Sequence, residues 1–87
     1  MAQAEQELTR LSALLERQRR ALQGIPGVVG TAVGLRDPNE PRSAVAIQVF
    51  VASPALVDQI RNQAGRLVGE NNVAVIVSGG MEPFGRP

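Results

Sequence analysis

Three segments of the chain are rich in Val, Ala and Ile and contain no charged residue, which predicts β-strands. They run from Val28 to Leu35, from Ala44 to Val51 and from Val73 to Ser78. A sheet with one face in water normally alternates apolar with polar side chains. Neither face of this sheet has the polar set that water requires, so we expect another molecule or domain to help cover it.

The two alternating sets of side chains differ in size more than in polarity. The larger set comprises Val29, Thr31, Val33 and Leu35 with Val45, Ile47, Val49 and Val51. The smaller set comprises Val28, Gly30, Ala32 and Gly34 with Ala44, Ala46, Gln48 and Phe50. The small-residue face is therefore one candidate surface for self-association.

Residues 2–23 have the pattern of an amphipathic helix. Its apolar stripe recurs at spacings of four and three and consists of Ala4, Leu8, Leu11, Leu15, Gln18 and Leu22. Gly24 and Pro26 end the helix. A helix of this length spans about 33 Å, whereas eight strand residues span about 26 Å. We therefore expect Leu8 and Leu11 to lie beyond the local core, where a second chain covers them; the alternative is that the first turns fray.

A second helix is predicted to begin at Ser53-Pro54 and to end at Gly69. The order is thus α-β-β-α-β, an α+β fold in one domain of residues 1–80, with residues 81–87 as a tail or linker. The β-α-β portion predicts a right-handed crossover. We expect the first strand to lie between the other two, in a split β-α-β arrangement within a mostly antiparallel, three-stranded sheet.

Composition excludes several kinds of chemistry. The 87 residues include no Cys and no His, which removes disulfides, thiolate ligands and the usual general base. All nine basic residues are Arg, and the net charge of +1 argues against nucleic-acid or membrane partners. The start MAQAEQELTR is unlike a signal peptide, so a cytoplasmic protein is the expectation. No cofactor or metal is expected.

Two short motifs invite a binding interpretation. Gly27-Val28-Val29-Gly30 matches the bare G-x-x-G of a nucleic-acid-clamping loop, but that loop lies between two helices and usually carries basic residues. Close backbone packing is the alternative that we favour. The run from Arg17 to Arg20 offers cations for phosphate, although cations also favour a helix C-terminus on electrostatic grounds.

Candidate catalytic and metal-binding groups are sparse. Asp37, Asn39 and Glu40 gather oxygen atoms in the connection between the first two strands, but they lack the spacing of a calcium loop, and a turn explains them better. The serines have no His or Lys to activate them. We therefore expect that the chain is not an enzyme.

The strand motifs carry a resemblance to one known family of domains. The run Gly27 to Leu35, the strand Val45 to Val51 and the run Val73 to Gly79 resemble the small domain that precedes trypsin-like peptidase domains in some bacterial proteins. The resemblance covers roughly residues 20–80 and implies a non-catalytic accessory or pro-domain. No peptidase domain is present in these 87 residues, and the tail from Pro83 would then be the start of a linker.

The element order is also similar to the ring-building motif of bacterial secretion, flagellar and sporulation ring proteins. Those domains have an I-x-G-V entry like Ile25-Pro26-Gly27-Val28. The resemblance implies side-by-side assembly into homo-oligomers, although the membrane anchor that usually accompanies that motif is missing from this sequence.

The leading hypothesis is a non-catalytic, self-associating interaction module that forms a homo-oligomer. The alternatives are a regulatory or pro-domain of a trypsin-like peptidase and a weak nucleic-acid-binding module. The predicted interface residues are Leu8, Leu11, Leu15, Leu22, Val28, Ala32, Ala46 and Phe50.

Overall fold

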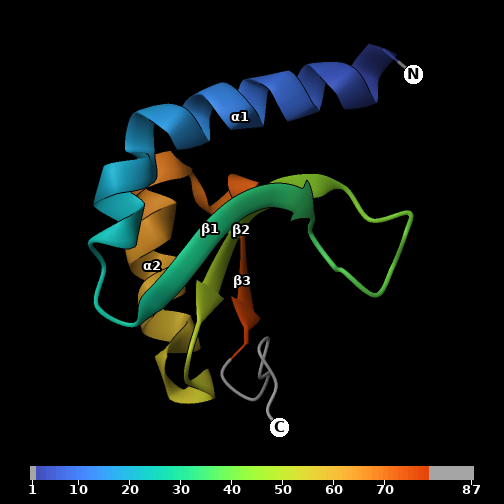
Figure 1. Cartoon of the computed structure of the whole chain (residues 1–87). Coiled ribbons are helices and arrows are strands. Elements are labelled where there is room, and N and C mark those ends of the chain that lie inside the picture. The colour runs from blue at the N-terminus through green and yellow to red at the C-terminus, as the bar shows by residue number, and fades with distance from the viewer. Residues whose placement is uncertain (1, 79–87) are drawn as a thin grey trace, which may run out of the picture.

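The computed structural model describes residues 2–78, so the predicted tail of residues 81–87 lies outside the described residues. Helices and strands follow in the predicted order α-β-β-α-β, and the α+β class is confirmed (Figure 1). The elements are α1 (Ala2–Gln23), β1 (Val28–Leu35), β2 (Val45–Val51), a 3₁₀ turn (Pro54–Leu56), α2 (Val57–Val68), a second 3₁₀ turn (Glu70–Asn72) and β3 (Val73–Val77).

Local sequence signals determine where these elements begin and end. The Ser53 hydroxyl accepts a hydrogen bond from the backbone N–H of Ala55 at 3.2 Å and so caps the turn that leads into α2. Gly69 ends α2 with φ of 95°, a conformation that favours glycine. At the end of α1, the N–H of Gly24 still donates to the Arg20 carbonyl at 3.1 Å, and Pro26 prevents a further turn.

The strand order in the sheet is β1-β2-β3, with β2 in the centre. β1 pairs antiparallel with β2, whereas β3 pairs parallel with β2. The sheet is therefore mixed, and the expectation that the first strand lies between the other two is wrong. The chain passes from β2 through α2 to β3, and these two strands are neighbours in the sheet with no strand between them.

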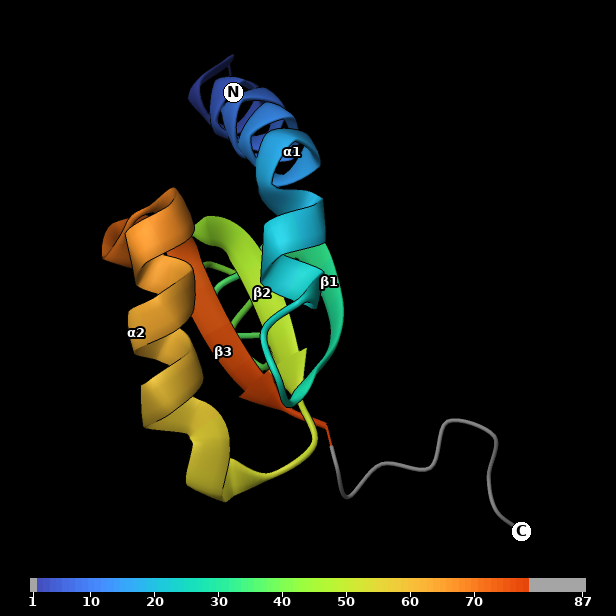
Figure 2. The same ribbon diagram turned by 90° about the vertical axis from the view of Figure 1, so that its left-hand side faces the viewer.

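The packing of the helices explains this strand order. α1 lies over β1 and β2, while α2 lies beside α1 and over β3 (Figure 2). A strand placed outside β1 would require α2 to cross the region that α1 already occupies. β3 therefore takes the free edge of β2, at the end of a short crossover through Pro54–Leu56 and α2.

The core forms between the helices and one face of the sheet. The central strand contributes Ile47, Val49 and Val51, whose side chains are fully buried. The helices contribute Leu11, Leu15, Leu22, Ile60, Ala64 and Val68 to the same cluster. Both helices thus lie on one face, which we call the helix face, and no helix among residues 2–78 lies on the opposite face, which we call the open face.

A β-bulge in β1 moves the side chain of Val28 to the other face of the sheet. Val28 lies opposite Val51, but the register then shifts between Val28 and Gly30. As a result Val28 packs against the core, although alternation placed it on the small-residue face. Val29, which alternation placed in the large apolar set, is 61% exposed.

The first turns of α1 extend past the end of the sheet, as its length predicts (Figures 1 and 2). Leu8 in this region is 42% exposed, whereas Leu11, one turn later, is buried at 1%. The expectation that α1 carries leucines beyond the core therefore holds for Leu8 and is wrong for Leu11, which packs in the core. Among the described residues, neither helix is both long and apolar enough to cross a membrane.

Candidate interaction surface

The leucine stripe of α1 is mainly a core surface. Leu11, Leu15 and Leu22 are at most 3% exposed and belong to the hydrophobic core of the chain itself. They were predicted as interface residues, and for these three the prediction is wrong because the sheet and α2 already bury them. Leu8 alone among the predicted leucines retains a substantial exposed surface.

The predicted sheet residues divide in the same way. Val28 packs against the core because of the bulge and is partly buried there, and Ala46 is fully buried in the central strand, so neither belongs to the accessible part of the open face. Ala32 and Phe50 are partly exposed, and they lie on the open face as predicted. The open face therefore retains part of the predicted interface, and the helix stripe retains only Leu8.

The open face consists of rows of residues that run across the sheet. Because directly paired residues share a face, the register places Gly30, Phe50 and Ile76 in one row and Ala32, Gln48 and Ala74 in the next. Gly34 and Ala46 form a third row. None of these side chains is charged. Ala46 and Ala74 are buried, so the open face offers water or a partner the partly exposed residues Gly30, Ala32, Gly34, Gln48, Phe50 and Ile76.

Two side chains of β2 lie over glycines of β1. A Cβ atom at Gly30 would lie 3.8 Å from the Phe50 ring, and one at Gly34 would lie 2.8 Å from Gln48 Nε2. The Gln48 amide also donates to the Leu35 carbonyl at 2.9 Å. Phe50 and Gln48 thus partly shield the face to which they belong, and any larger residue at Gly34 would displace Gln48.

Arg36 connects the two outer strands at one end of the sheet. Its Nη1 donates to the Val73 carbonyl at 2.9 Å, and its Nη2 donates to the Asn71 carbonyl. The side chain therefore extends from the end of β1, past the first residues of β2, to the start of β3. A guanidinium that binds backbone carbonyls in this way has a structural role at this position.

The G-x-x-G segment has a packing role in this fold. Gly27 has φ of 97°, and a Cβ atom there would lie 2.5 Å from Leu56 Cδ1. Glycine therefore allows the loop before β1 to lie close to the start of α2. This contact supports the packing interpretation that we favoured from the sequence.

The oxygen-rich connection between β1 and β2 is organised as a turn. The Asp37 carboxylate accepts a hydrogen bond from the Asn39 N–H at 3.0 Å, as in an Asx turn. The Ser43 hydroxyl accepts from the Asp37 N–H at 3.1 Å. Among residues 2–78 no group of three or more carboxylate, His or Cys side chains is placed to hold a metal ion.

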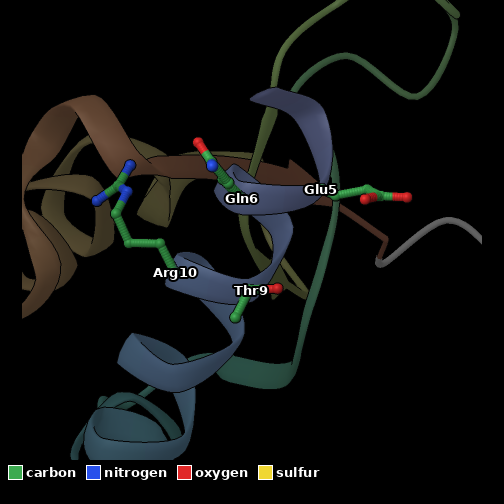
Figure 3. A pocket seen from close by; sticks show the side chains of 4 residues that line it. All are labelled: Glu5, Gln6, Thr9 and Arg10. Carbon is green, nitrogen blue, oxygen red and sulfur yellow. The ribbon is translucent and has the colours of Figure 1, made fainter. Parts of the chain in front are cut away.

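A shallow hollow of about 450 Å³ lies beside the first turns of α1 and is lined by Glu5, Gln6, Thr9 and Arg10 (Figure 3). The side chains of Glu5 and Arg10 point in opposite directions, so these groups do not converge on one ligand. Arg10 instead binds the Glu7 carboxylate at 2.7 Å and the Asn72 side-chain oxygen at 3.1 Å.

This contact shifts the ionisation of both partners. The hydrogen bond from Arg10, assisted by its charge, lowers the pKa of Glu7, and the same bond raises the pKa of Arg10. Both side chains are exposed, so solvent screens the pair. Together with the bond to Asn72, the pair attaches α1 to the turn before β3.

No protein-family model matches this chain, and no curated protein or solved structure is significantly similar to it. The two resemblances noted from short motifs therefore remain expectations, and the proposed function rests on the open face and the edge of β1.

Proposed function

We propose that this chain is a non-catalytic interaction module whose partner is a second copy of itself. The observation that supports the proposal is the asymmetry of the sheet. Both helices lie on the helix face, whereas the three rows of the open face and the whole of β1 carry no charged side chain. The nearest charge on that side is Arg36, which lies just beyond β1 and binds the carbonyls of Asn71 and Val73 at one end of the sheet.

The absence of charge favours a second copy over an unrelated partner. In a two-fold dimer the same patch meets itself, so a patch with one sign of charge repels its own copy. A surface made of Gly, Ala, Phe and Ile has no such penalty. The rows of small residues also permit close approach of another backbone or side chain.

The test is the mass of the intact chain in solution. Sedimentation equilibrium from low micromolar to millimolar concentration should show a mass that rises above the 9.2 kDa of one chain. Because the surface is uncharged, added salt should not weaken the association. A mass of one chain across the whole range would overturn the proposal.

A matched pair of variants assigns the effect to the sheet. Ala32→Glu places a charge on the open face beside the edge of β1, while Gln59→Glu places the same charge on an exposed position of α2. We expect the first variant to lower the association constant at least tenfold and the second to leave it unchanged. Equal effects of the two variants would show that the sheet is not the contact.

A further inference from the structure

We propose that the contact is an antiparallel pairing of β1 with β1 of a second copy, with Ala32 facing Ala32 across the two-fold axis. This inference rests on the proposed self-association and specifies its geometry. The paired subunits would form one continuous six-stranded sheet. The helices of both copies would lie on one side of that sheet, and both open faces would lie on the other.

The hydrogen-bond pattern between β1 and β2 shows which backbone groups of β1 remain available at its outer edge. The N–H of Arg36 donates to the Ala44 carbonyl at 2.6 Å, so Arg36 and Ala44 form a hydrogen-bonded pair. Hydrogen-bonded pairs occur at every second residue of an antiparallel ladder. Ala32 and Gly34 therefore direct their backbone groups toward β2, whereas Thr31, Val33 and Leu35 direct theirs away from the sheet.

The free edge of β1 lacks the features with which proteins usually prevent strand pairing. Its residues include no charge and no proline, and the strand is eight residues long. β3, at the other edge, has only five residues, and Arg36 already binds the carbonyl of its first residue, Val73. β1 is therefore the better of the two edges for a second strand.

Two features limit the register. The bulge distorts the strand between Val28 and Gly30, and Gln48 already donates to the Leu35 carbonyl. Between the bulge and Leu35, the part of the β1 edge that is free to pair regularly is centred on Ala32. With the two-fold axis at Ala32, Thr31 of each copy pairs with Val33 of the other, and these central pairs alone form four backbone hydrogen bonds.

The size of the open face argues against simple stacking of two faces. Three strands at about 4.8 Å spacing and about 20 Å of strand length give roughly 300 Å², whereas a stable interface buries about 800 Å² on each partner. The open face of one subunit is too small to provide such an interface. Edge pairing does not depend on the area of the open face, because it satisfies the outward backbone groups of β1 directly.

Disulfide trapping tests the geometry, because the natural chain has no cysteine. Across the axis, the Cα atoms of a non-hydrogen-bonded pair lie about 4.5 Å apart, within the range of about 4.4–6.8 Å that disulfides adopt. Ala32→Cys should therefore form a covalent dimer under mild oxidation, at least tenfold faster than Ile76→Cys. Ile76 lies on the same face but on β3, and in the paired sheet its two copies would be about 24 Å apart.

The outcomes separate this inference from the proposed function. Slow trapping at residue 32 with rapid trapping at residue 76, in a chain that associates, would overturn the edge pairing and leave self-association standing. A wild-type chain that remains monomeric would overturn both proposals. Circular dichroism of each variant shows whether it has folded.

A second measurement uses the wild-type chain and a backbone variant. The amide protons of Thr31 and Val33 should exchange more slowly as protein concentration rises, by at least tenfold. Thr31→Pro removes an outward N–H without removing a hydrogen bond to β2, so it should abolish association and leave the subunit folded. Concentration-independent exchange, or association that persists in a folded Thr31→Pro chain, would overturn the edge pairing.

Discussion

β2 contributes side chains to both faces of the sheet, and the two faces have very different surroundings. On the helix face, Ile47, Val49 and Val51 are fully buried by the helices. On the open face, Phe50 and Gln48 are partly exposed and lie over the glycines of β1. The comparison shows that apolar composition alone does not reveal which face of a strand forms the core. The cover that a helix supplies decides that question, and several substitutions test the difference.

The largest effect is expected from Leu15→Arg on the helix face. Leu15 is 3% exposed within the core, so the substitution would bury an unpaired charge. We expect the subunit itself to unfold, because domains of this size have only about 5–15 kcal/mol of stability. Circular dichroism and the dispersion of the amide-proton chemical shifts in an NMR spectrum measure whether the variant is folded. The half-exposed Leu8 is the control, and Leu8→Arg should remain folded; a folded monomer with Arg at position 15 would contradict the assignment of Leu15 to the core.

A matched pair of isoleucines compares the two faces directly. Ile47 is fully buried, and Ile47→Ala should destabilise the subunit by about 2–5 kcal/mol. Ile76 lies on the open face of the neighbouring strand and is partly exposed, so Ile76→Ala should cost about 1 kcal/mol or less at concentrations where the chain is monomeric. Urea unfolding of both variants measures the difference. Similar losses would show that the open face is as well covered as the helix face.

Gly27 tests the loop that brings α1 and β1 close to α2. Gly27→Ala introduces a Cβ atom 2.5 Å from Leu56 Cδ1 at a φ of 97°, and we expect a loss of about 1–3 kcal/mol. Gly24→Ala is the control, since its Cβ would lie 3.4 Å from the nearest atom and its φ is not in the positive region. If the two variants unfold at the same denaturant concentration, Gly27 has no special packing role.

The smallest effect is expected at the exposed Glu7–Arg10 pair. A lowered pKa of Glu7 in the folded state means that the pair stabilises the chain above the unfolded pKa. That contribution is lost as the pH falls through the folded pKa. NMR titration of the Glu7 carboxyl should show a higher pKa in the Arg10→Gln variant, and high salt should reduce the difference. An unchanged Glu7 pKa in that variant would contradict the assigned cause.

The bounds of the helices and strands were predictable because glycine, proline and a capping serine mark them. Gly24, Ser53 and Gly69 each lie where the structure ends or begins a helix. The alternation along β2 separated the side chains of the two faces, but it did not indicate which face the helices cover. These signals are local, and they act on the backbone within a few residues of themselves.

The strand order and the bulge were not predictable from the same signals. Placing β1 or β2 in the centre buries nearly the same side chains, so periodicity does not distinguish the two sheets. The order depends on the space that α1 occupies over β1 and β2. The shift at Val28 leaves no mark in a run of apolar residues, since both Val28 and Val29 suit either face.

The candidate surface was predictable only in part. Leu11 and Leu15 carry the spacing of an interface helix, but a core helix has the same spacing, and only the packing shows that the sheet uses them internally. The free edge of β1 depends on the strand order and therefore could not be located from the sequence. The absence of charge along β1, in contrast, was visible at once and remains the main support for a partner.

The bonds from Arg36 have a consequence for how the subunit opens. β1 and β3 lie on opposite sides of β2 and share no ladder, yet this one side chain joins the end of β1 to the backbone before and within β3. Separation of either β1 or β3 from the sheet at that end must break the hydrogen bonds of Arg36. The two margins of the sheet should consequently loosen as one cooperative unit, so that a fluctuation which frays one margin also weakens the other.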